Sequence, residues 1–150
     1  MLWPTKAKKK QRTINRKQKR RRPRVESLED RRLLAVNVAA PGGGTFNVVE
    51  SGLTPGSSDQ VTIASTGNAG EFRITGQNGT QVQLNGGALV SGPEGVVVNN
   101  IFGNVAVALG GGTNSLTVAE NTTFPASFGI NNTGVNDTNT LQGTNPPVTI

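Results

Sequence analysis

Short hydrophobic triplets recur along the chain from residue 41 onward. Each has the pattern apolar–any–apolar and stands between turn residues rich in Gly and Asn, so its two apolar side chains share one face of a short strand. Eight triplets occupy residues 61–63, 72–74, 82–84, 96–98, 105–107, 116–118, 128–130 and 148–150, and a weaker one occupies 139–141. No helical periodicity survives among them. The pattern predicts an all-β body over residues 41–150.

Every second triplet begins at a nearly constant interval from the one before, at Val61, Val82, Val105, Phe128 and Val148. A repeat of about 22 residues is typical of stacked coils. We therefore predict a right-handed parallel β-helix, or a related β-solenoid, with Val, Ile, Leu and Phe inside. A β-sandwich is the alternative, because strands every 8–12 residues or so, separated by turns, suit it equally well. Since the last triplet ends the chain without a polar cap, we also expect the domain to be truncated at its C-terminal end.

Residues 1–40 differ from this body. Residues 1–24 are almost entirely basic and polar, so like-charge repulsion predicts a disordered polybasic segment. In residues 25–40, Ser27 and Asp30 are spaced as a helix N-cap and a first-turn acid, which predicts a short helix from Leu28 to Val36. The expected organisation is thus a polybasic segment (1–24), a sorting segment with a short helix (25–40) and a β domain (41–150).

Charge follows the same division. The chain has 15 Lys and Arg against 9 Asp and Glu, and it has no His, Cys or Tyr. Residues 1–40 carry a net charge of +11 and residues 41–150 a net charge of −5. Without His or Cys there is no thiolate or imidazole metal ligand, no disulfide and no nucleophile paired with His. No apolar run approaches the roughly 18 residues that a membrane-spanning helix needs.

The N-terminal segment has features of an export signal. Such a signal combines a basic region, an apolar region of about 7–15 residues and a small-residue cleavage site. Here the basic region is long, the apolar region covers residues 33–40 with Asn37 inside it, and a cut after Ala40 would leave Pro41 at the new N-terminus. These features indicate an extracellular or cell-surface protein whose first partner is the export machinery.

The same segment resembles a known sorting motif. Residues 21–35 read RRPRVESLEDRRLLA, which is similar to the N-terminal motif of large secreted or surface proteins of planctomycete bacteria, with its Glu-x-Leu-Glu-x-Arg-x-Leu-Leu type of core. The matching residues are Arg21, Arg22, Glu26, Leu28, Glu29, Arg31, Arg32, Leu33 and Leu34. Asp30 replaces the Pro of the best-known variant. The resemblance implies export, a β-rich repetitive body and surface or extracellular-matrix partners, and it implies nothing about catalysis.

Three candidate sites have plainer explanations. Residues 112–116 resemble half of a calcium-binding β-roll repeat, but Asn114 stands where an Asp is needed, and Asp137 in the following loop is the one weak candidate for a metal ligand. Tight turns explain the same Gly and Asn residues. Glu71 and Arg73 would share a strand face, as in a polysaccharide-acting β-helix enzyme, or form a solvated pair. The five Phe residues are assigned to the core and not to a sugar-binding surface.

The basic tail could bind nucleic acid through phosphate neutralisation. The body behind it is acidic and has no basic face, so nucleic acid is the lesser expectation. We therefore predict a non-enzymatic exported or cell-surface protein, structural or adhesive, with no catalytic residue and no cofactor. The alternatives are a nucleic-acid-associated protein that uses its tail and a polysaccharide-acting β-helix enzyme.

Overall fold

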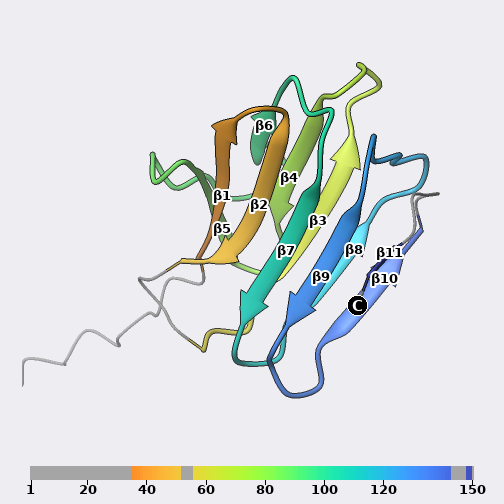
Figure 1. The fold of residues 1–150 in the computed structure, drawn as a ribbon. Coiled ribbons are helices and arrows are strands. Elements are labelled where there is room, and N and C mark those ends of the chain that lie inside the picture. The colour runs from red at the N-terminus through yellow and green to blue at the C-terminus, as the bar shows by residue number, and fades with distance from the viewer. Residues whose placement is uncertain (1–34, 52–55, 143–147, 150) are drawn as a thin grey trace, which may run out of the picture. The chain divides into compact units, whose positions relative to one another are not determined.

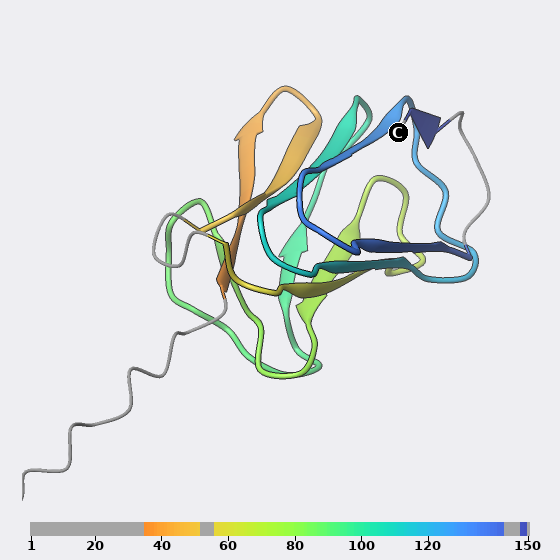
Figure 2. The ribbon, with the colours of Figure 1, turned by 90° about the horizontal axis from the view of Figure 1, so that it is seen from below.

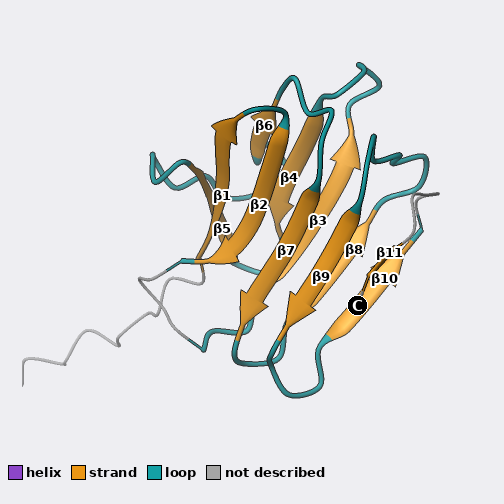
Figure 3. Ribbon diagram, in the orientation of Figure 1, coloured by secondary structure: helices purple, strands orange, loops and turns teal. Residues whose placement is uncertain are grey.

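The computed structural model describes residues 35–51, 56–142 and 148–149, the last two by their backbone alone. All of them belong to one compact unit, Arg31–Ile150. In these residues the chain forms strands and loops only (Figure 3). Alternating apolar side chains and frequent glycines explain this, because both disfavour helix.

The strands of the described residues form two sheets (Figure 1). The first sheet has the order β11–β9–β7–β2–β1–β5, with β11 Val148–Thr149, β9 Phe128–Asn132, β7 Val105–Gly110, β2 Thr45–Glu50, β1 Ala35–Gly42 and β5 Gln81–Leu84. The second has the order β10–β8–β3–β4–β6, with β10 Thr138–Leu141, β8 Ser115–Val118, β3 Gln60–Ser65, β4 Phe72–Gly76 and β6 Val96–Val98.

The core lies between these sheets and consists of the alternate residues of their strands. Val36 and Val38 of β1, for example, are fully buried, and so is Ile63 of β3. Four phenylalanines join the two layers, in the order Phe46, Phe72, Phe124 and Phe128, with ring centroids 5.7, 5.4 and 4.3 Å apart. In β3 to β9 the apolar positions of the triplets thus form the inward face of the strand, whereas Leu141 of β10 is exposed.

The parallel β-solenoid predicted from the triplet spacing is wrong, and the described residues show no β-helix repeat. A solenoid needs each strand to run parallel to the one a coil earlier, whereas β1 pairs antiparallel with β2, β3 with β4, and β4 with β6. Gly42, Gly43 and Gly44 close the β1–β2 turn with φ angles of 98°, 72° and 77°, which other residues rarely adopt. The fold is sandwich-like, with two mixed sheets packed together, so the β-sandwich alternative fits better.

The regular spacing of the triplets has a local cause. β7 pairs parallel with β9, with Val105 opposite Phe128, and β8 pairs parallel with β10, with Leu116 opposite Asn139. The chain alternates between the sheets over these strands, which can be followed from teal to blue in Figure 2. In contrast, the parallel partner of Val105 in β2 is Phe46, which lies much farther away in the sequence. Spacing therefore reflects one group of strands and not the architecture.

β1 begins inside the segment predicted to be a short helix. Residues 28–34 of that helix lie outside the described part of the chain, and its last two residues, Ala35 and Val36, are extended and fully buried. β1 pairs with β2 on one side and β5 on the other. Asn85 also holds its end, since the amide of Ala40 donates to Asn85 Oδ1 at 2.8 Å. Most of the predicted apolar signal region is therefore a central strand of the domain.

Candidate functional site

Three polar residues form a row across the second sheet, each directly before a strand. Asp59 precedes β3, Asn114 precedes β8 and Asp137 precedes β10. The backbone amide of Asp59 donates to Asn114 Oδ1 at 2.9 Å, and the amide of Asn114 donates to Asp137 Oδ1 at 2.8 Å. We call these three residues the Asx row. Each acceptor satisfies the amide at the start of the neighbouring parallel strand, so the row aligns three strand ends.

Asn114 is the centre of the Asx row and is fully buried. Besides accepting the Asp59 amide, its Nδ2 donates to the carbonyl oxygens of Gly110 and Gly111 at 3.3 and 3.0 Å. One side chain thus connects the β7–β8 turn to the start of β3. Asn114, which stands in place of a calcium-binding Asp, therefore has a structural role, because its side-chain amide bonds the backbone of two segments.

Asp137, the predicted metal candidate, has both carboxylate oxygens engaged. Oδ1 accepts the amide of Asn114, and Oδ2 accepts the amide of Gly134 at 3.0 Å. This is the pattern of a carboxylate that caps a turn. In the described residues no group of three or more His, Cys, Asp or Glu side chains is placed to hold a metal ion. A metal at Asp137 stays a prediction.

A second carboxylate lies beside the Asx row. The amide of Ser57 donates to Glu50 Oε1 at 3.1 Å, and the hydroxyl of the same serine donates to Asp59 Oδ2 at 2.9 Å. Ser57 therefore connects two acids, which we call the carboxylate pair (Glu50 and Asp59). Asp59 is fully buried, and its other oxygen, Oδ1, has no hydrogen-bond partner among the described residues.

The environment of Asp59 favours its neutral form. Burial raises its pKa from 3.8 to about 6; the hydrogen bond from Ser57 opposes this rise, and the nearby charge of Glu50 adds to it. Buried carboxylates with an unsatisfied oxygen are rare, because the lost hydration is costly. Asp59 is the most perturbed acid of the described domain, which makes the carboxylate pair the strongest candidate site.

Glu71 and Arg73, the enzyme candidates, serve separate structural roles. The side chains of Thr66 and Asn68 donate to Glu71 Oε1 at 2.5 and 3.1 Å, and these hydrogen bonds lower the pKa of Glu71. Arg73 donates from Nη1 to the backbone oxygen of Glu94 at 2.5 Å. Glu71 thus supports the turn before β4, and Arg73 ties β4 to the loop before β6.

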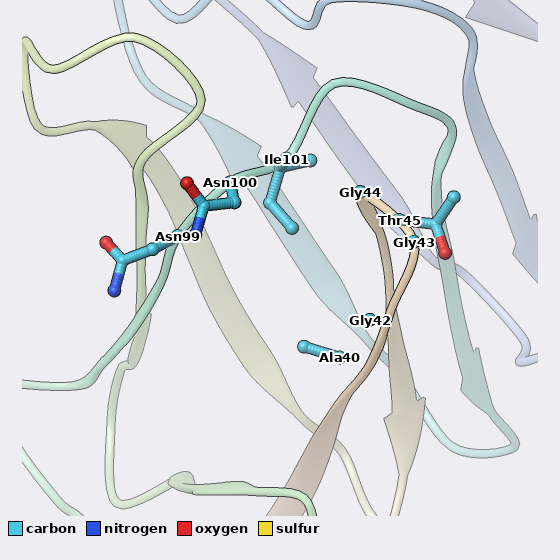
Figure 4. A pocket seen from close by; sticks show the side chains of 8 residues that line it. All are labelled: Ala40, Gly42, Gly43, Gly44, Thr45, Asn99, Asn100 and Ile101. Carbon is cyan, nitrogen blue, oxygen red and sulfur yellow. The ribbon is translucent and has the colours of Figure 1, made fainter.

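A small cavity opens at the β1–β2 turn (Figure 4). It has a volume of about 290 Å³ and is lined by Ala40, residues 42–45 and residues 99–101. Figure 4 shows the glycines of the turn on one wall and Asn99, Asn100 and Ile101 on the other. The lining supplies amide and hydroxyl groups and backbone, which can hydrogen-bond a ligand but cannot transfer protons at neutral pH.

The assignment of every Phe to the core is wrong for Phe102. Its side chain is 63% exposed, whereas the other phenylalanines are buried. The amide of Phe102 donates to the Gly44 carbonyl at 2.9 Å, which fixes the backbone next to the cavity wall. Ile101 is buried in its place, so the sequence offers two adjacent apolar residues of which one faces the core.

Comparison with protein-family models, curated proteins and solved structures gives no match. The site must therefore be interpreted from its own chemistry. The sorting motif, residues 21–34, lies outside the described residues, so its interactions stay predictions. The part of the chain that is described contains no helix able to span a membrane.

Sequence reasoning did not find the carboxylate pair. Glu50 and Asp59 are well separated along the chain, and neither belongs to a recognisable motif. The available signal was their position at either end of residues 51–58 (SGLTPGSS), because such a composition predicts a loop that returns the chain close to its start. Which oxygen of which acid would be buried could not be inferred from this pattern.

Proposed function

We propose that the chain is a non-enzymatic exported or cell-surface protein, in which the N-terminal segment directs export and the two-sheet domain is a structural scaffold. The Asx row is the observation that carries the scaffold role. Asp59, Asn114 and Asp137 use their side chains or amides to hold strand ends together. Glu71 and Asn85 also bond turns or strands of the same domain. Polar side chains that bond backbone groups in this way stabilise the fold, and these residues form no acid–base pair with one another.

The export role is supported by the N-terminal sequence. A basic region precedes the Leu33–Leu34 pair, and the motif around this pair resembles that of planctomycete surface proteins. β1 limits how such a segment could be processed. Ala35 is fully buried, and its carbonyl accepts the amide of Ser51 at 3.0 Å. A mature protein that keeps the intact domain must therefore be cut before Ala35, and not after Ala40.

The test is the cellular location and the mature N-terminus of the full chain, by fractionation and intact mass. We expect a product outside the cytoplasm whose N-terminus lies at or before Ala35. Replacing Leu33 and Leu34 by Asp should stop export, because it removes apolar signal residues without touching β1. Lys9→Gln, a change in the long basic region, is the matched control and should still be exported.

Two results would overturn the proposal. One is export of the Leu33/Leu34 double variant at the level of the unchanged chain. The other is an uncut cytoplasmic protein that salt elutes from nucleic acid, which would favour the nucleic-acid alternative and make the tail the active part. Arg73 is the single Lys or Arg among the described residues and already bonds Glu94, so such binding would have to come from the N-terminal segment.

A further inference from the structure

One buried carboxylate oxygen of the described domain has no hydrogen-bond partner. Asp59 Oδ1 is enclosed and unpartnered, although the other oxygen of the same carboxylate accepts the Ser57 hydroxyl. Buried carboxylates are normally hydrogen-bonded, protonated or bound to a cation. A backbone amide could have met this oxygen, as happens at Asn114 and Asp137, but among the described residues none does.

The second acid makes a cation the better partner. Glu50 accepts the Ser57 amide while Asp59 accepts the Ser57 hydroxyl, so one residue holds both carboxylates near each other. No Lys or Arg side chain of the described residues neutralises them, because the single one, Arg73, bonds the backbone of Glu94. Two acids that bond one serine and have no basic neighbour among the described residues repel each other when both are charged, and a bound cation would offset this repulsion.

The backbone around the pair adds further oxygen atoms. A Cβ on Gly112 would collide with the carbonyl oxygen of Ser57 and approach that of Gly56 to 3.0 Å. A Cβ on Gly110 would collide with Glu50 Oε2. Gly110 and Gly112 thus leave space beside the β7–β8 turn for the Glu50 carboxylate and for the carbonyl oxygens that flank the carboxylate pair, space that a larger residue would fill.

We propose that Glu50 and Asp59 bind one calcium ion, with Asp59 Oδ1 as its buried ligand and backbone or water oxygens completing the shell. Calcium suits this mixture because it accepts six to eight or so oxygens in flexible geometry, whereas magnesium demands a near-ideal octahedron. With two carboxylates, the affinity belongs in the range of about 0.1–1 mM found in extracellular modules. The inference rests on the proposed function only in that an exported protein meets calcium at such concentrations.

The experiment is thermal unfolding of the full chain, stripped with EDTA and followed by far-ultraviolet circular dichroism, against CaCl2 and MgCl2 at constant ionic strength. At ten times the dissociation constant, calcium should raise Tm by about 5 °C, and magnesium should raise it much less. Asp59→Asn and Glu50→Gln should lose the calcium response. Glu120→Gln, a change at an exposed acid before a different loop, is the control and should keep it.

A second measurement protects against variants that fold poorly. Amide chemical shifts of the unchanged chain are followed during the calcium titration, and the saturable shifts should centre on Ser57, Asp59 and residues 110–112. Three results overturn the proposal: no calcium-specific rise in Tm, equal responses to both metals in every variant, or saturable shifts elsewhere. Asp59 is then simply a buried carboxylic acid. Failure here leaves the export test unaffected, because that test reads location and not metal binding.

Discussion

Asn114→Ala tests the Asx row most directly. The change removes two donors to the carbonyls of Gly110 and Gly111 and the acceptor of the Asp59 amide. Each hydrogen bond contributes about 1 kcal/mol, and a buried amide left unsatisfied costs about 1–3 kcal/mol. Since Asn114 is fully buried, water does not replace the lost partners easily. We expect a loss of about 3–4 kcal/mol, a large part of the roughly 5–15 kcal/mol that stabilises a domain.

The assay is urea unfolding followed by far-ultraviolet circular dichroism, because the only Trp is Trp3 and the chain has no Tyr. Asn104→Ala is the matched control, since exposed Asn104 accepts a single long hydrogen bond of 3.4 Å from the Ser127 amide. It should change stability by less than about 0.5 kcal/mol. A loss below about 1 kcal/mol for Asn114→Ala, or one equal to that of the control, would refute the energetic role of the row.

Three further outcomes are expected. In EDTA, the free energy of unfolding should fall by up to about 3 kcal/mol as pH rises from about 4 to 7, because the folded Asp59 keeps its proton up to a pKa of about 6. Urea titrations repeated at each pH measure this fall, and Asp59→Asn should flatten it. Gly112→Ala should lower the free energy of unfolding by at least about 2 kcal/mol, because its Cβ would collide with a backbone carbonyl. Gly43→Ala has open space at a similarly positive φ and should cost about 1 kcal/mol. Calorimetry that finds equal losses for the two variants would contradict the steric argument. Phe128→Ala should cost about 3–5 kcal/mol and the exposed Phe102→Ala under about 0.5 kcal/mol, measured by thermal unfolding, and the reverse order would contradict the assignment of the core.

The positions of β3 to β11 were predictable from the triplets, whereas β1, β2 and the directions of the strands were not. Alternation at Val61 and Ile63, or at Phe128 and Ile130, marks a strand because buried side chains repeat every second residue. The same alternation fits a parallel or an antiparallel neighbour. Direction depends on turns such as the one at Gly42, whose positive φ closes a hairpin that spacing alone cannot distinguish from a longer connection.

The candidate site was less predictable, because its parts come from distant segments. Asp59 and Asn114 are 55 residues apart, and only the pairing of β3 with β8 brings them together. The sequence identified the loop that contains Asn114 and the weak metal candidate Asp137. It could not show that both carboxylate oxygens of Asp137 accept backbone amides, whereas one carboxylate oxygen of Asp59 has no hydrogen-bond partner among the described residues. Long-range pairing decides which acid has a free oxygen.

The Asx row has a consequence for how the parallel strands find their alignment. In β3 and β8 a slip by one residue would turn the buried apolar side chains, such as Ile63 and Leu116, outward, so the core opposes it. A slip by two residues would leave the same face inward, and the hydrophobic pattern alone could not oppose it. Such a slip would separate the amide of Asn114 from Asp137 and the amide of Asp59 from Asn114. The row thus penalises the one misalignment that burial tolerates.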